Sequence, residues 1–191
     1  MSNKVKFGLK NVFYSIVTET VTSGVISYSY ATPVHIPGAV SLSLDIEGDT
    51  NTFYADNTAF YQSIANNGYS GSLEMALIPD SFRTAALGEI EATNKVLAEY
   101  SDAKPAAFAL AFQVEGDDKE TCYWYYNCIA SRPNVEQNTT EDTIEPTTET
   151  LDVTIAPRIK DGLVRIKSND ETPAATITAW FNAVLEPTLT T

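Results

Sequence analysis

Alternation of apolar and polar residues is the dominant pattern along this chain. In the segment AVSLSLDIE, residues 39–47, every second residue is apolar and the residues between them are polar. The apolar set is Val40, Leu42, Leu44 and Ile46, and the polar set is Ser41, Ser43, Asp45 and Glu47. Successive side chains of a strand point to opposite faces, so this pattern indicates a strand with one buried face.

Similar runs predict that most of the fold is β. They lie at residues 11–19, 25–30, 70–78, 108–115, 121–130, 151–157 and 163–168. The loop 115–119, sequence EGDDK, predicts a hairpin between two of these strands, and Asp161-Gly162 has the two-residue signature of a tight hairpin. Short successive strands with Gly and Asp turns favour an antiparallel, two-sheet sandwich or barrel.

Two helices are expected beside the strands. A short one is predicted near residues 80–87, where Asp80 can cap the segment and Gly88 ends it. A C-terminal helix is predicted near residues 173–185, with an apolar stripe at helical spacing. The stripe is Ile177, Trp180, Phe181 and Val184. We expect it to be buried on the chain's own sheet, with burial against a neighbouring subunit as the alternative.

Charge narrows the classes of partner. The chain of 191 residues carries 12 Lys and Arg against 25 Asp and Glu, a net charge of −13. A protein that grips phosphates needs clustered cations, so the balance argues against binding to nucleic acid or to anionic lipid and favours a protein partner. We predict one domain over residues 1–191, with no signal peptide and no membrane-spanning segment.

One segment, residues 133–150, is expected to form a long polar arm. It contains carboxylates and no cation, whereas four cations gather shortly after it around Asp161-Gly162. The carboxylates are Glu136, Glu141, Asp142, Glu145 and Glu149, and the cations are Arg158, Lys160, Arg165 and Lys167. The two sets can meet head to tail between identical subunits. A contact within one chain and a solvated surface loop are the alternatives.

The sequence contains no GxSxG, no glycine-rich phosphate loop and no HExxH motif, so we expect no enzyme, no cofactor and no metal site. His35 stands alone between prolines, and the segment 45–51, DIEGDTN, lacks the full spacing of a calcium loop. Cys122 and Cys128 are predicted on one face of a strand, too far apart for a disulfide, as free core thiols. The aromatic run 123–126 alternates between faces, which favours packing over a sugar-binding platform.

Nine segments spread over nearly the whole chain carry a resemblance to a known family. They are GLKNV (8–12), IPGAVSLSLD (36–45), FYADN (53–57), NNGYSG (66–71), LIPDSF (77–82), AKPAAFAL (103–110), YNCIASRP (126–133), TTEDTIEP (139–146) and DGLVRIK (161–167). In these segments the chain resembles the major tail proteins of long, non-contractile-tailed bacteriophages of Gram-positive hosts.

The resemblance implies a tail-tube fold, with two packed sheets and a flanking helix. It further implies hexameric rings that close an inner β-barrel and stack into a tube through which the genome passes. The other partners would be the tape measure, tail terminator and distal tail proteins, and the chain would be made in the host cytoplasm and reside in the virion tail. DNA would pass without specific binding, because a negative lumen repels phosphates.

Two sets of residues are candidates for roles in such a tube. Ser41, Ser43, Asp45 and Glu47 are predicted to line the lumen, whereas the arm carboxylates and the four cations are predicted to form contacts between subunits. A carbohydrate-binding or adhesin-like β-sandwich is the alternative function. A hydrolase that uses two carboxylates is a more distant one.

Overall fold

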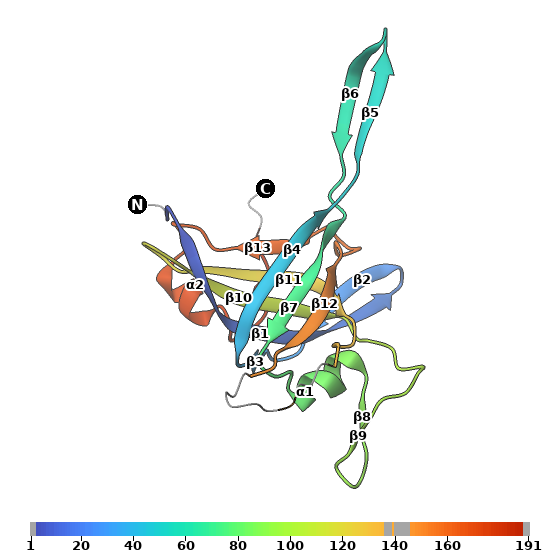
Figure 1. Ribbon diagram of the computed structural model, residues 1–191. Coiled ribbons are helices and arrows are strands. Elements are labelled where there is room, and N and C mark those ends of the chain that lie inside the picture. The colour runs from blue at the N-terminus through green and yellow to red at the C-terminus, as the bar shows by residue number, and fades with distance from the viewer. Residues whose placement is uncertain (1–2, 136–138, 140–145, 189–191) are drawn as a thin grey trace.

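The computed structural model describes residues 3–135, 139 and 146–188, and in them the protein is mainly β. The longer strands are β1 (Lys6–Thr22), β2 (Val25–Tyr30), β4 (Ala39–Glu47), β5 (Thr50–Ala55), β6 (Thr58–Ile64), β7 (Gly68–Met75), β10 (Phe108–Gly116), β11 (Thr121–Ala130) and β12 (Glu149–Ile155). The short ones are β3 (Val34–Ile36), β8 (Ile90–Glu91), β9 (Leu97–Ala98) and β13 (Arg165–Lys167). The expectation of an antiparallel, mainly β fold is confirmed (Figure 1).

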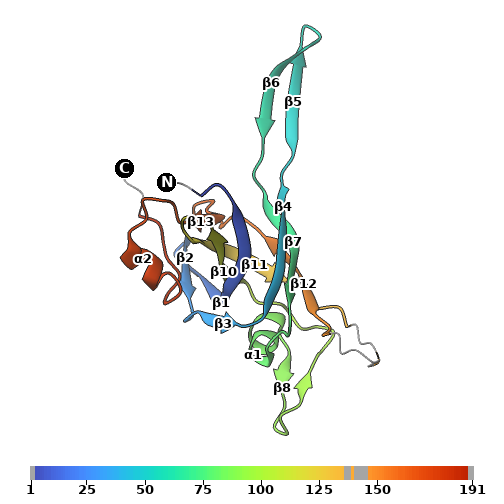
Figure 2. The same ribbon diagram turned by 60° about the vertical axis from the view of Figure 1, so that its left-hand side comes forward.

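One sheet, rather than two separate ones, forms the body. Its path is β2-β1-β10-β11-β12-β7-β4, with β3 paired to β1 and β13 paired to β11, and its strand pairs are antiparallel. The sheet curls until β4 approaches β1 (Figure 2). No strand pairing joins β4 to β1 in the described residues, so the sheet does not close into a barrel. Curling lets one sheet bury its inner face against itself.

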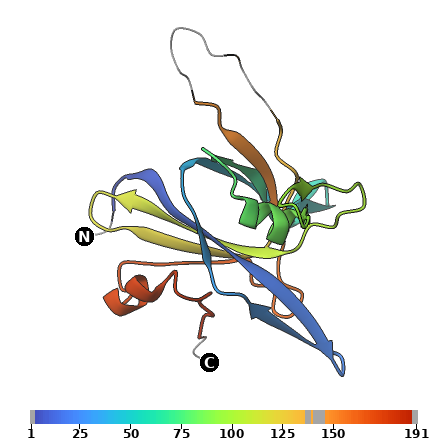
Figure 3. The ribbon, with the colours of Figure 1, turned by 90° about the horizontal axis from the view of Figure 1, so that it is seen from below.

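Two hydrophobic cores lie on the two faces of β10 and β11. The first fills the space inside the curled sheet and includes Phe82, Leu110, Tyr125 and Leu151. The second lies on the other side and packs Trp124 and Tyr126 against Trp180. Figure 3, seen from below, has the C-terminal helix α2 (Ala174–Ala179, red) on one side of the yellow strands and β12 (orange) on the other.

Both helices exist but differ in detail from the prediction. The first is α1 (Asp80–Phe82) followed by the wider turn η1 (Arg83–Leu87), and Gly88 ends it at φ 80°. Pro79 holds the N-cap position, and Asp80 lies in the first turn without capping through its side chain. The predicted apolar stripe packs on the chain's own sheet, because Trp180 is buried in the second core and Ile177, Phe181 and Val184 are partly buried against it.

The C-terminal helix is shorter than the predicted range 173–185. It ends at Ala179, and the next residues form tighter turns, in which Asn182 N–H donates to the carbonyl of Ala179. The Trp180 carbonyl accepts a hydrogen bond from Trp124 Nε1 at 3.0 Å, a bond from a side chain instead of from the helix's own backbone. A tertiary contact therefore competes with continuation of the helix.

The two predicted hairpins had different outcomes. The loop at residues 115–119 joins β10 to β11 in an antiparallel pair, as predicted. At Asp161-Gly162 the chain turns tightly, with Gly162 N–H bonded to the carbonyl of Arg158 at 2.8 Å. No strand precedes this turn within the described residues after β12, and β13 pairs with β11 instead. The hairpin prediction was wrong there because the turn residues specify a reversal, not a strand partner.

A bulge in β11 overturns the prediction that both cysteines share one face. Phe108 pairs with Cys128 and Leu110 pairs with Tyr125, so Tyr126 and Asn127 together oppose Ala109. The extra residue reverses the alternation after Tyr126. Cys122 consequently belongs to the second core and Cys128 to the first, and both are free and buried.

Candidate assembly surfaces

A continuous polar face covers the outer side of β4, β7 and β12. Registers align Ser41 with Glu74 and Thr150, Ser43 with Ser72 and Asp152, and Asp45 with Ser70 and Thr154, with Glu47 at the end of β4. These ten residues, which we call the polar face, comprise six hydroxyl and four carboxyl side chains. Their strand neighbours Leu42, Leu73 and Leu151 point the other way, into or against the first core. The four candidates on β4 are therefore exposed together on one face.

Hydrogen bonds hold one carboxylate of the polar face, that of Glu74, in the charged form. Glu74 accepts a hydrogen bond from Thr148 Oγ1 at 2.7 Å and another from Ser41 Oγ at 2.8 Å. The two bonds lower the pKa of Glu74 below its usual value, and the bond from Thr148 has the larger effect. Ser70 Oγ also donates a hydrogen bond to Glu47. The face is therefore negative and hydroxyl-rich at neutral pH.

A bulge at the start of β4 corrects the predicted apolar set. Ala39 pairs with Met75 and Ser41 with Glu74, which leaves Val40 outside the ladder. Ala39, not Val40, packs against the first core together with Leu42 and Leu44. Simple alternation failed at Val40 because the bulge inserts one residue before the regular part of the strand begins.

A two-stranded hairpin, β5–β6, rises away from the body at the ends of β4 and β7 (Figures 1 and 2). Five large side chains on it are exposed, with Phe60 at 73% and Ile64 at 79% exposure. The set is Phe53, Tyr54, Phe60, Tyr61 and Ile64. Exposed apolar patches of this kind mark interaction surfaces more often than ordinary solvated surface. We call this element the aromatic hairpin.

Sequence analysis missed the aromatic hairpin, although a turn signal was present. All seven residues of β6 are exposed, so the strand has no buried face and no diagnostic alternation. The turn residues Asp56 and Asn57 both have positive φ, 52° and 59°. Asp and Asn in a two-residue loop with this backbone are typical of the primed hairpin turns.

A groove of about 540 Å³ opens between β1 and β4, beside the base of the hairpin. Its floor is aromatic, because Phe112 stacks on Tyr123 at 4.9 Å between ring centroids and on Tyr125 at 5.8 Å. Leu42, Leu44 and Ile46 of β4 line one wall. Desolvation raises the pKa of Tyr125 to about 12, so its hydroxyl stays neutral. The open curl of the sheet thus leaves part of the first core accessible.

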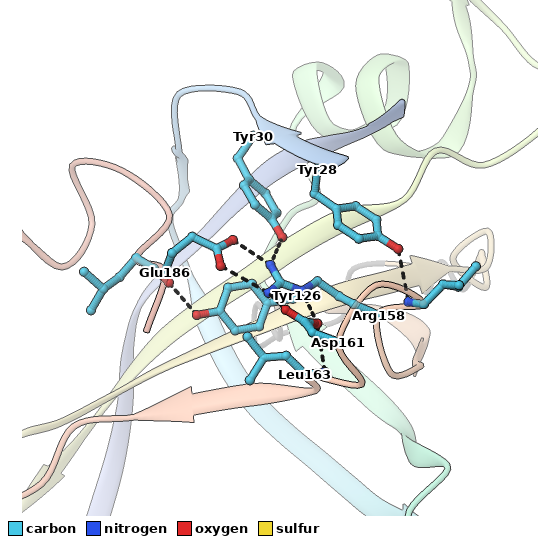
Figure 4. Close-up of polar contacts among 9 residues, drawn as sticks. Tyr28, Tyr30, Tyr126, Arg158, Asp161, Leu163 and Glu186 are labelled. Atoms are coloured by element: carbon cyan, nitrogen blue, oxygen red, sulfur yellow. Dashed lines mark hydrogen bonds and ion pairs between the residues drawn. The ribbon is translucent and has the colours of Figure 1, made fainter. Parts of the chain in front are cut away.

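On the opposite side, Arg158 fastens the C-terminal segment to the body (Figure 4). Its side chain is 3% exposed and contacts Asp161, Glu186 and the Tyr30 hydroxyl, with 2.5 Å between Nη1 and Glu186 Oε1. Its guanidinium lies 4.9 Å from the Tyr126 ring centroid. Burial alone would lower the pKa of Arg158, but the hydrogen bonds to Glu186 and Asp161 raise it above its ordinary value. We call this cluster the arginine clasp.

The predicted inter-subunit residues fall into three groups. Glu136, Glu141, Asp142 and Glu145 lie outside the described residues. Glu149 and Arg158 have partners within the chain, since Glu149 pairs with Arg83 at 2.6 Å and Arg158 belongs to the clasp. Lys160, Arg165 and Lys167 are exposed. Glu149, the one candidate arm carboxylate among the described residues, therefore pairs with Arg83 and not with the cations around Asp161-Gly162.

The remaining sites considered from sequence can also be placed. The ring of His35 lies on β3 at 4.9 Å from that of Phe13. All four residues of the aromatic run 123–126 are buried. Trp124 and Tyr126 belong to the second core, whereas Tyr123 and Tyr125 belong to the first core and line the groove. In the described part of the chain, no three His, Cys, Asp or Glu side chains gather as a metal site. No helix there is long and apolar enough to cross a membrane.

Comparison with known proteins identifies no family for this chain. No family model matches the chain, and no curated protein sequence matches it.

Proposed function

We propose that this chain is a tail-tube protein of a long-tailed bacteriophage. In this proposal it is a structural protein, not an enzyme, and six copies form a ring around a central channel. Rings stack into a tube that conducts the viral genome. The curled sheet with its C-terminal helix corresponds to the tail-tube domain, and its polar face lines the channel.

The polar face is the observation that supports this proposal most strongly. It has four carboxylates, six hydroxyls and no cation among its ten residues. A ring of six chains would thus present 24 such carboxylates to the channel. Negative charge repels the phosphates of DNA, and short hydroxyl side chains hold water without offering an apolar surface. A duplex can slide past such a wall without adhering.

Unpaired strand edges give a second line of support. Strand β4 ends the path of the sheet and, among the strands of the described residues, pairs only with β7, so its other edge has backbone groups without a strand partner there. Long exposed edges invite pairing with another chain. In a ring, the edge of β4 would meet a strand of the next subunit, and the polar faces of the six subunits would together form the inner wall.

Electron microscopy of the concentrated, purified protein tests the proposal. We expect hollow rings or tubes with a central channel. Particles that stay monomeric at every soluble concentration would contradict it. A monodisperse monomer that binds glycans would instead favour the carbohydrate-binding alternative.

Added cations on the polar face test the role of its charge. We expect tubes with Ser43→Lys and Ser70→Lys to retain duplex DNA at low salt and release it as salt rises. Wild-type tubes should retain none. The matched control places Ala175→Lys and Thr178→Lys on α2, which lies on the far side of the body from β4 (Figure 2). Equal retention by both variants would show that the polar face does not line the channel.

A further inference from the structure

The groove between β1 and β4 differs in charge from the rest of this acidic protein. Among the described residues that line it, two are cations, Lys6 and Arg165, and none is Asp or Glu. Neither cation has a carboxylate within ion-pair distance in the described part of the chain. Lys6 Nζ instead donates to the Tyr123 hydroxyl at 3.3 Å, and the Arg165 guanidinium lies 5.9 Å from the Tyr123 ring centroid.

These features are typical of a binding site for an apolar segment that carries negative charge. Its aromatic and aliphatic walls favour an apolar occupant, and its unpaired cations favour one with carboxylates. Strand β4 also offers a free edge along one wall for backbone hydrogen bonds. An occupant that is extended, aromatic and acidic would satisfy all three.

The aromatic hairpin of this same chain has that chemistry. Between residues 48 and 66 it carries two carboxylates, Asp49 and Asp56, and no cation. Its large side chains are exposed and its strands are extended. It rises away from the body and does not lie in the groove of its own chain (Figures 1 and 2). The partner that fits both surfaces is therefore another copy.

We propose that the groove between β1 and β4 receives the aromatic hairpin of a second copy of this chain. The contact joins two different surfaces, so it is directional and each copy has one donor and one acceptor. Such a contact propagates into a ring or a filament rather than ending at a dimer. The inference rests on the proposed tube assembly and names the surfaces through which its subunits recognise one another.

Complementary charge reversal tests the contact in the full chain. One variant carries Lys6→Glu and Arg165→Glu in the groove, and the other carries Asp49→Lys and Asp56→Lys in the hairpin. We expect each variant alone to associate about ten- to a hundred-fold more weakly than wild type, because like charges then face each other. An equal mixture should associate again, since each hairpin finds a groove of opposite charge. Sedimentation measures association, and circular dichroism checks folding.

A cysteine pair provides a second measurement. Chains with Phe60→Cys and chains with Ile46→Cys should form a disulfide-linked heterodimer when mixed under mild oxidation. Chains with Ala175→Cys on α2 are the control and should form none with Phe60→Cys. The native cysteines are buried and should not compete.

The outcomes separate this inference from the proposed function. If wild-type tubes form and both reversed variants also form them unaided, the docking inference is wrong and the tube proposal stands. If the mixture rescues association but the assemblies lack a channel, the docking inference stands and the tube proposal is wrong. If wild type never associates, both are wrong.

Discussion

The two faces of β10 and β11 are completed in different ways. On one face the chain covers its own second core with the segment that contains Trp180, and Arg158 locks that segment through Asp161 and Glu186. On the other face part of the first core stays open as a groove, and Arg165 at its rim has no carboxylate partner in the described residues. Two arginines seven residues apart thus have opposite environments.

The difference separates residues that hold the fold from residues available to another molecule. A buried arginine with several carboxylate and hydroxyl partners contributes to stability, because its removal leaves those partners without their cation. An exposed, unpaired arginine beside an apolar groove contributes little to stability. Stability and association should therefore respond separately to changes on the two faces.

The largest loss of stability is expected on the face of β10 and β11 where the chain covers its own second core. Trp180→Ala should lower the free energy of unfolding by about 3–5 kcal/mol, because it removes a buried aromatic side chain from the second core. Chemical denaturation measures this value. Phe53→Ala on the aromatic hairpin is the matched control and should change stability by less than about 0.5 kcal/mol. Similar losses in both variants would break the distinction between the two regions.

The arginine clasp should give the next largest effect. Arg158→Met should lower the free energy of unfolding by about 2 kcal/mol, because Tyr30, Asp161 and Glu186 lose their shared partner. Thermal unfolding provides the measurement. An unchanged melting temperature would mean that the clasp does not hold the C-terminal segment.

Acid should weaken the clasp in a defined direction. The hydrogen bond from Arg158 lowers the pKa of Asp161 below its usual value, so this pair contributes stability above the unfolded pKa. That contribution is lost as pH falls below about 4 and through the folded pKa. Asp161→Asn should be less stable than wild type at pH 7 and lose less stability between pH 5 and 3. Parallel pH profiles would contradict this account.

The smallest effect on stability is expected at the groove. Arg165→Met should change the free energy of unfolding by less than about 0.5 kcal/mol and still weaken self-association. Arg165→Lys keeps the charge and should retain most of the association. Sedimentation and denaturation of the same samples compare the two effects. A large loss of stability in Arg165→Met would place it with Arg158 instead.

Strands with at least one packed face could be predicted from sequence. The bounds predicted for residues 25–30, 39–47 and 121–130 coincide with β2, β4 and β11. Each packs at least one set of alternate residues against other strands or a core. The bulges in β4 and β11 could not be predicted from alternation, because an inserted residue reverses the pattern without leaving a compositional signal.

Part of the candidate site could also be predicted, and part could not. The shared exposure of Ser41, Ser43, Asp45 and Glu47 followed from alternation, but the residues from β7 and β12 that complete the polar face depend on strand order. The groove depends on how far the sheet curls. Interactions between distant segments, such as Arg158 with Tyr30, are equally invisible in local patterns.

A cryo-EM reconstruction of the assembled protein at side-chain resolution tests the central claim most directly. We expect a ring in which Ser43, Asp45 and Asp152 face the central channel of a stacked tube. Assemblies in which these side chains face the outer surface, or particles with no channel, would contradict it.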